Sequence, residues 1–165
     1  MDGEPEAQDL DIEAQAEHAA QFAGSLVEAM GLKGSAVARV EDETVLVAIE
    51  GEGLGLLVGP GGKTLTAIEE LVRAVVQHGL SGRSARLRVD VGGYRERRRE
   101  ALMRFAAQVA DDVKRTGTAK ALEPMPSSDR KVVHEALLDV DGVTTRSEGD
   151  DPHRRVIIDP APAAD

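Results

Sequence analysis

The stretch Val58-Gly59-Pro60-Gly61-Gly62-Lys63-Thr64-Leu65 decides the fold, because it interrupts the chain between two apolar helical patterns. Three glycines and a proline cannot continue a helix, so the backbone must turn sharply here. Glycines at a helix N-terminus, where N–H groups are exposed and the helix dipole is positive, form a place where a phosphate can lie against the backbone. That phosphate could belong to a nucleotide or to a nucleic-acid strand.

The spacing of the glycines argues against a nucleotide-hydrolysing loop. The P-loop motif needs a glycine five residues before Gly62, and that position is Leu57. The nearest glycine, Gly55, lies two residues too early. A dinucleotide-binding fingerprint fails as well, because Val58 stands where its third glycine is needed. A nucleotide hydrolase is therefore the weakest interpretation.

The same spacing fits the Gly-x-x-Gly loop of a KH domain, which clamps the backbone of about four single-stranded nucleotides. The loop would be Gly59-Pro60-Gly61-Gly62, with Lys63 adding a positive charge. The apolar residues within 53–58 indicate the short helix that precedes the loop of a KH domain. The four loop residues alone would favour an ordinary helix–helix turn, which is the alternative interpretation. Apolar residues at spacings of three and four predict the longer helix after the loop: Leu65, Ile68, Leu71, Val72, Val75 and Val76.

Composition limits the class of protein. At 165 residues the chain holds one medium or two small domains, and without cysteine it has no disulfide framework. No apolar run approaches the ~20 residues that span a bilayer, and the acidic N-terminus is unlike a signal peptide, so we expect a cytoplasmic protein without membrane insertion. The aromatic residues Phe22, Tyr94 and Phe105 are too few for the base-stacking surface of an RRM or an OB-fold. A KH domain uses an aliphatic groove instead.

The net charge of −10 is distributed unevenly along the chain. Residues 1–18 carry seven acidic residues and no lysine or arginine, whereas residues 83–120 carry eleven basic residues against five acidic ones. This asymmetry indicates a basic surface beside an acidic tail, although arginines on a helix often form only a solvated face.

The hydrophobic periodicity predicts an α+β chain of two small domains. We expect a disordered acidic tail at 1–10, a first domain at 11–92 with the type II KH order α-β-β-α-α-β, and a tail at 161–165. Gly92-Gly93 marks the boundary to a second domain at 93–160 with the order α-β-α-β-β. Its elements are a helix over 94–116, a strand over 119–122, a helix that Ser127 or Ser128 caps and that runs to about Asp139, and strands over 143–147 and 154–158. The buried stripe expected on the first of these helices is Leu102, Phe105, Ala106, Val109 and Val113.

Arg130 and His134 are four residues apart on a predicted helix, so they share one face. With Ser127 and Ser128 at the start of that helix they would form a phosphate-sized group of hydrogen-bond donors on an exposed face. A purely structural histidine remains the alternative. No serine or carboxylate stands in a recognisable nucleophile motif, and the other histidines lack metal-ligand spacing, so we expect neither an enzyme nor a metal site.

Three linked motifs carry a family resemblance: Val91-Gly92-Gly93-Tyr94-Arg95-Glu96-Arg97-Arg98-Arg99-Glu100, Leu122-Glu123-Pro124-Met125-Pro126 with Arg130-x-x-x-His134, and Ser147-Glu148-Gly149 with Arg154–Ile158. Over residues 19–160 the chain resembles the bacterial Jag (SpoIIIJ-associated, KhpB) family. The resemblance implies a KH domain followed by an Arg-x-x-x-His domain, both binding single-stranded nucleic acid, mainly RNA and alternatively DNA. It also implies post-transcriptional control linked to cell envelope growth and division, with a small KH-only protein as partner.

The loop departs from the family pattern, because Pro60-Gly61 stands where a basic residue is usual. We therefore expect weaker phosphate clamping by the loop and a larger contribution from the arginines of residues 83–104. A protein-interaction adaptor with little RNA affinity is the alternative function, and no cofactor is expected. The predicted RNA-binding residues are Gly59, Pro60, Gly61, Gly62, Lys63, Ile68, Arg86, Arg88, Arg95, Arg98, Ser128, Arg130 and His134.

Overall fold

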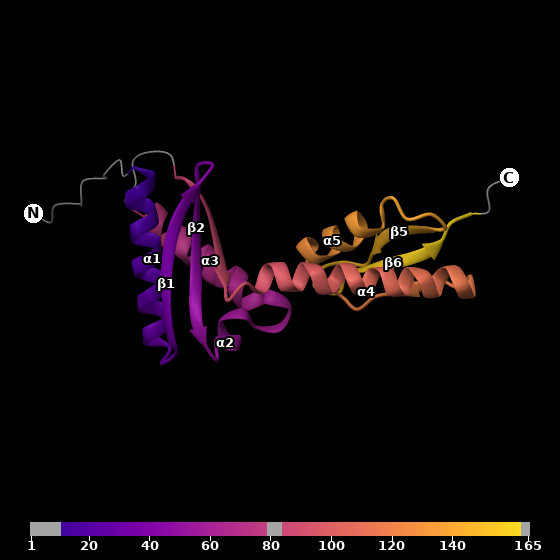
Figure 1. Ribbon diagram of the computed structural model, residues 1–165, viewed down its shortest axis with the longest axis horizontal. Helices are drawn as coiled ribbons and strands as arrows, with labels where there is room; N and C mark the ends of the chain where they lie inside the picture. Colours follow the sequence, from indigo (N-terminus) through magenta and orange to yellow (C-terminus); the bar gives the residue numbers. More distant parts are fainter. Residues whose placement is uncertain (1–10, 79–83, 163–165) are drawn as a thin grey trace, which may run out of the picture. The chain divides into compact units, whose positions relative to one another are not determined.

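The computed structural model describes residues 11–78 and 84–162. The tail predicted at 1–10 and the last three residues of the tail predicted at 161–165 therefore lie outside the described residues. The chain divides into two compact units, the first ending at Arg95 and the second beginning at Glu96 (Figure 1). The sequence placed the boundary three residues earlier, between 92 and 93. No helix in the described ranges is long and apolar enough to cross a membrane.

The first unit has the predicted order α-β-β-α-α-β, which confirms the expected α+β class. A three-stranded sheet runs in the order β1-β2-β3, with β1 antiparallel and β3 parallel to β2. The elements are α1 (Ile12–Ala29), β1 (Lys33–Glu41), β2 (Thr44–Glu52), α2 (Gly55–Val58), the 3₁₀ turn η1 (Pro60–Gly62), α3 (Lys63–Gln77) and β3 (Arg86–Val91).

Local signals explain where α1 begins and ends. The Asp11 side chain accepts a hydrogen bond from the Ala14 N–H at 2.8 Å, which satisfies one of the helix's unpaired donors. Gly31, just past the C-terminus, has φ +70°, a left-handed conformation that glycine adopts without strain. The helix buries mainly small side chains, which allows it to lie close to the sheet: Ala16, Ala19, Ala23 and Val27.

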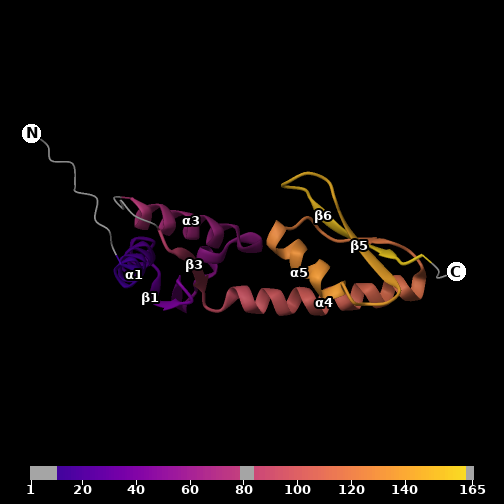
Figure 2. The same cartoon turned by 90° about the horizontal axis from the view of Figure 1, so that it is seen from above.

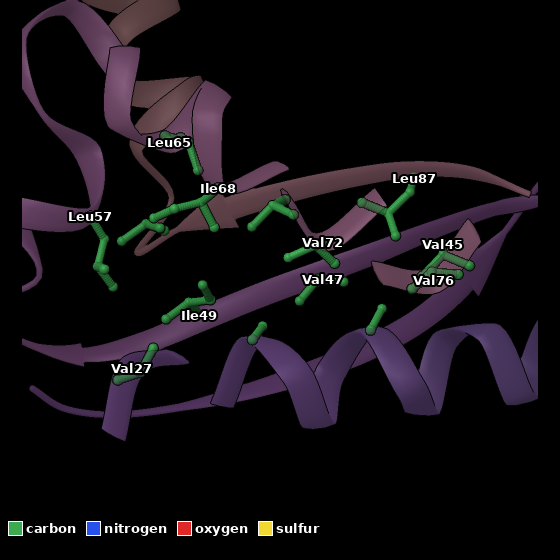
Figure 3. Packing of buried hydrophobic residues seen from close by; sticks show 14 of the residues in the cluster. Val27, Val45, Val47, Ile49, Leu57, Leu65, Ile68, Val72, Val76 and Leu87 are labelled. Atoms are coloured by element: carbon green, nitrogen blue, oxygen red, sulfur yellow. The ribbon is translucent and has the colours of Figure 1, made fainter. Parts of the chain in front are cut away.

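The core of the first unit lies between the helices and one face of the sheet. Alternation along β2 buries Val45, Val47 and Ile49, and the same period along β3 buries Leu87, Val89 and Val91. Helices α1 and α3 contact each other and this face. Figure 3 shows the apolar side chains of α3 meeting those of β2 and α2 there, including Leu65, Ile68, Val72 and Val76.

The second unit has the predicted order α-β-α-β-β. Its sheet is antiparallel throughout, in the order β4-β6-β5. Figure 2 shows β5 and β6 side by side. The elements are α4 (Tyr94–Thr116, which begins in the first unit), β4 (Lys120–Ala121), α5 (Ser127–Leu137), β5 (Val143–Glu148) and β6 (Arg155–Pro160).

Two sequence predictions for this unit are wrong. Phe105 remains 47% exposed, because the buried stripe of α4 is centred on Leu102, Ala106 and Val113, and Phe105 lies at its flank. The N-cap of α5 is Pro126, with Ser127 already inside the helix and no side chain capping it.

Candidate nucleic-acid interface

The glycine loop between α2 and α3 has a backbone that requires glycine at three positions. Gly59 has φ +68° and ψ 176°, Gly61 has φ +60°, and Gly62 has φ +78°. Residues that carry a Cβ rarely adopt these φ and ψ angles. The Gly59 N–H donates to the Gly55 carbonyl at 3.0 Å, and the Gly62 N–H donates to the Gly59 carbonyl at 3.2 Å. The loop is thus a defined turn held by its own backbone.

The loop presents Pro60 and Gly61 to solvent and buries Gly62. A Cβ placed on Gly62 would lie 3.0 Å from a ring carbon of Tyr94, so the tyrosine ring packs directly against the loop backbone. Gly62 is also the N-cap of α3 and offers no side chain to the first N–H groups of that helix. The exposed part of the loop therefore lies next to a helix N-terminus, where backbone donors favour an anion.

Three cationic side chains of the first unit are exposed where the sequence predicted them. Lys63 is the first residue of α3, and Arg86 and Arg88 alternate with buried residues along β3. Within residues 11–78 and 84–162, none of the three forms an ion pair. Their charges are therefore available to a polyanion without first breaking an ion pair among the described residues.

Ile68 does not line an open groove. It is only 6% exposed and packs in the core with Leu57 and Val72 (Figure 3), so it stabilises the unit and cannot present its side chain to a base. The large apolar side chains exposed on α2 and α3 are those of Leu56, at 68%, and Leu71, at 45%.

Arg95 is occupied inside the first unit. Its Nη2 donates to Glu69 Oε2 at 2.8 Å, and its Nε donates to the Val89 carbonyl at 2.9 Å. Its own N–H donates to Asp90 Oδ1 at 3.2 Å. Glu69 also accepts from the Val89 N–H at 2.9 Å, so Arg95 and Glu69 together tie the start of α4 to β3 and α3. The role of Arg95 is therefore structural rather than that of a free phosphate ligand.

Arg98 is held within the second unit. Its Nη2 lies 3.1 Å from Asp129 Oδ2, and Asp129 is buried at the start of α5. The pair fastens α5 to α4. Ser128, beside it, is exposed on the first turn of α5 and keeps its predicted position at a helix N-terminus.

Arg130 is not on an exposed face. It is only 8% exposed, and its Nη1 lies 3.3 Å from Oδ1 of Asp151, whose side chain is 70% exposed. A buried guanidinium needs such a partner, because an unpaired buried charge is costly. Arg130 therefore links α5 to the loop between β5 and β6.

His134 has both ring nitrogens engaged by hydroxyls of β5. Its Nδ1 lies 2.7 Å from Thr145 Oγ1, and its Nε2 lies 2.9 Å from Ser147 Oγ. Burial lowers the pKa of His134, and the positive charge of Arg130 lowers it further. The ring is thus a neutral clamp between α5 and β5, rather than a cation aimed at solvent.

The lowered pKa of His134 makes the second unit less stable in acid. Because the unfolded chain titrates near the ordinary value of 6.5, it binds the proton before the folded chain does as the pH falls. The contribution of the neutral His134 ring to the stability of the folded unit is therefore fully present above about pH 6.5. It is lost as the pH falls through and below that value. We expect thermal unfolding of this unit to shift to lower temperature between about pH 7.5 and about pH 5.5.

Nuclear magnetic resonance titration of the His134 ring protons measures the shift directly, and unfolding at both pH values measures its consequence. His134→Gln should reduce the acid destabilisation, whereas His153→Gln, at an exposed position of the same unit, serves as the control. A His134 titration midpoint above 6.5 would contradict this account.

Sequence reasoning missed Glu69, Asp129, Thr145 and Ser147. The first two are carboxylates that the sequence presents as ordinary helical charges. Thr145 and Ser147 are two apart on a strand and therefore share a face, which is a signal that they could contact the same group. Nothing in their spacing shows that this group is His134.

The second unit corresponds to a known domain. Residues 100–160 match the family of Arg-x-x-x-His domains, which is named for that motif, and the matched range contains both Arg130 and His134. The chain as a whole belongs to the Jag/KhpB family. This agrees with the resemblance in its junction and Arg-x-x-x-His motifs.

Three relatives show how far the similarity extends. The "RNA-binding protein KhpB" of Clostridium symbiosum is 41% identical over 112 residues, which are 68% of this chain and 50% of that protein. The protein of the same name from Lactiplantibacillus plantarum is 43% identical over 105 residues, 63% of this chain and 32% of that protein. That of Bacillus subtilis is 34% identical over 136 residues, 81% and 65% of the two chains. The chain thus spans from about a third to two thirds of these relatives.

Proposed function

We propose that this chain is a non-enzymatic RNA-binding protein that recognises single-stranded RNA. The observation that carries the proposal is the glycine-only backbone of residues 59–62, with an exposed tip and an exposed Lys63 at the N-terminus of α3. This arrangement supports the assignment of residues 11–92 as a KH domain, whose loop grips a single-stranded backbone. The names of the relatives support RNA as the ligand.

In the first unit, Gly61 and Lys63 would meet phosphate, while Arg86 and Arg88 add positive charge. Such contacts position a strand and contribute affinity without reading its sequence. Leu56 and Leu71 replace Ile68 as the aliphatic side chains that a base can reach.

In the second unit, residues 93–160, exposed side chains would bind phosphate. Arg130 and His134 would stabilise the fold that positions these side chains. Arg99 and Arg104 on α4 are 54% and 69% exposed, and their pairs with Glu96 and Glu100 have distances of 3.5 Å and 3.7 Å. Surface pairs of this kind contribute about 1 kcal/mol or less, so a phosphate can replace the carboxylate. Ser128 offers a hydroxyl at the start of α5.

The relationship to the Jag/KhpB family supports a wider proposal. The protein would act in the cytoplasm as a post-transcriptional regulator linked to cell envelope growth and division, affecting cell shape and cell wall organisation. Its partners would be single-stranded RNA, single-stranded DNA as a second ligand, and a small KH-only protein.

Fluorescence anisotropy of a labelled single-stranded RNA, titrated with the protein at two salt concentrations, tests RNA binding. Saturable binding that weakens with salt is expected, with a slope of about 0.7 per phosphate neutralised. Lys63→Glu should weaken binding about tenfold, a loss of about 1.4 kcal/mol. Arg115→Glu, the same charge change near the C-terminus of α4, should change it less than about twofold. Pro60→Lys should tighten binding, because it adds a cation at the loop tip.

Absence of saturable binding at low salt would reject RNA as the ligand and favour a protein-interaction adaptor. Equal effects of Lys63→Glu and Arg115→Glu would reject the loop as the site and leave only diffuse electrostatic attraction.

A further inference from the structure

Strand β1 forms an open edge of the first sheet. In the order β1-β2-β3 it lies at one end, and among the described residues its ladder partner is β2 alone. One side of its backbone therefore carries N–H and C=O groups free to pair with another strand. At nine residues, β1 is longer than a typical strand, so this edge could hold a full ladder.

The middle of this edge lacks the usual protection. Natural edge strands are blunted by charges, prolines or bulges that prevent pairing with other chains. The central segment Ala36-Val37-Ala38 contains none of these, and the Val37 side chain is 61% exposed. The charges of β1 lie toward its two ends, at Lys33, Arg39 and Glu41. Arg39 Nε donates to Glu41 Oε1 at 2.7 Å in an exposed pair, so Glu41 keeps carboxylate lone pairs for a second cation.

A groove runs along the same edge, between β1 and α1. Small residues of α1 leave it open, and a Cβ added to Gly24 would meet no atom within 4 Å. A second structural element could therefore approach both the strand edge and the helix. Its floor and walls include Ala16, Ala20, Gly24, Ala36, Ala38 and Val40.

We propose that this edge is a dimerisation surface, on which β1 of a second copy of this chain pairs antiparallel with β1. The charge pattern of the strand supports a second copy as the occupant. When two β1 strands pair about a twofold axis at Val37, Lys33 lies opposite Glu41 of the partner subunit, and the same pair forms again by symmetry. Ala36 then meets Ala38 of the partner subunit, so no like charges face each other across the ladder.

The positions of the small residues on α1 are consistent with the same twofold axis. Ala20 lines the groove beside Ala36, next to the centre of the ladder, and Ala16 and Gly24 lie one turn to either side of it. Glu17 and Gln21 of α1 also line the groove, beside these small residues. An antiparallel α1 of the partner subunit would thus bring small residues against small residues at the centre of the crossing, with Glu17 and Gln21 flanking it. Short side chains at a crossing allow two helices to approach closely.

Sedimentation of the full chain over a wide concentration range tests the proposal, with a reversible monomer–dimer equilibrium as the expected result. Lys33→Glu and Glu41→Lys should each weaken the dimer about tenfold, since each replaces two attractive cross-strand pairs with two repulsive ones. The double variant restores both pairs and should return the affinity to within about threefold of the original. These two positions lie at opposite ends of one strand, so the rescue cannot arise within a single chain.

A second pair of variants separates the groove from the fold. Gly24→Leu should raise the stability of the dilute monomer, because leucine favours a helix more than glycine does. The same leucine fills the groove and should weaken the dimer at least tenfold. Gly24→Ala, the control, should stabilise the helix and leave the dimer intact. A chain that stays monomeric at its highest soluble concentration, or a dimer unaffected by the charge reversals and by Gly24→Leu, would overturn the proposal.

Discussion

Replacing Gly59 with alanine is expected to destabilise the first unit by about 3–4 kcal/mol. The backbone at Gly59, with φ +68° and ψ 176°, lies in a region that is essentially restricted to glycine. The new Cβ would also collide with the Thr64 hydroxyl and lie 2.8 Å from the Thr64 Cβ. Thr64 is on the first turn of α3, so relief of the collision must move either the loop or the helix.

Urea denaturation followed by far-UV circular dichroism measures the loss in the free energy of unfolding. Hydrogen exchange tests whether the destabilised residues are those of the first unit. Gly55→Ala is the matched control: its Cβ meets no atom within 4 Å, and it should be neutral or stabilising by up to about 1 kcal/mol. Gly59→Ala combined with Thr64→Ala removes the collision with the hydroxyl, but it keeps the backbone strain and the 2.8 Å approach to the Cβ of residue 64, so it should recover only part of the loss of stability. Equal stability of the Gly59 and Gly55 variants would contradict the loop geometry.

Replacing Glu69 with alanine should cost the first unit about 2–3 kcal/mol. The Glu69 side chain is 18% exposed and accepts from the Arg95 guanidinium, the Val89 N–H, and Arg73 Nη2 at 3.1 Å. Its removal leaves the Val89 N–H without an acceptor and Arg95 without its carboxylate. Charge-assisted hydrogen bonds of this kind are stronger than neutral ones.

The measurement is again chemical denaturation, with Glu70→Ala as the control. Glu70 is the next residue of α3 and is exposed, so its replacement should change the free energy of unfolding by no more than about 0.5 kcal/mol. Similar effects for the two alanines would show that Glu69 is a surface charge and that Arg95 is free after all.

Elements with a strong local pattern could be predicted from the sequence. Strict alternation placed β3 at Arg86–Val91, and the glycines at 92–93 and 117 bracketed α4 at Tyr94–Thr116. In both cases the information lies within one element and its ends. The turn at the glycine loop could be predicted for the same reason, because glycine and proline act on their own backbone.

The roles of individual side chains could not be predicted in the same way, because they depend on distant partners. Arg95 donates a hydrogen bond to a carboxylate 26 residues away along the chain. His134 forms hydrogen bonds with hydroxyls that lie 11 and 13 residues away. Four-residue spacing correctly placed Arg130 and His134 on one face of a helix. Whether that face meets solvent or a strand is decided by tertiary packing, and here β5 covers it.

The same limit applies to apolar stripes. A helical period gives the direction of the core but not the width of the buried face. Leu71 and Phe105 both lie at the margins of such a face and stay exposed, whereas Ile68 falls well inside it.

The contact between Tyr94 and the backbone of Gly62 gives this protein a built-in optical reporter. The chain has no tryptophan and a single tyrosine, so its near-ultraviolet absorption beyond the weak phenylalanine bands comes from Tyr94. That ring lies against the glycine loop. A ligand that moves the loop should therefore change tyrosine emission and near-ultraviolet dichroism in the unlabelled protein, and loop engagement can be followed without a dye.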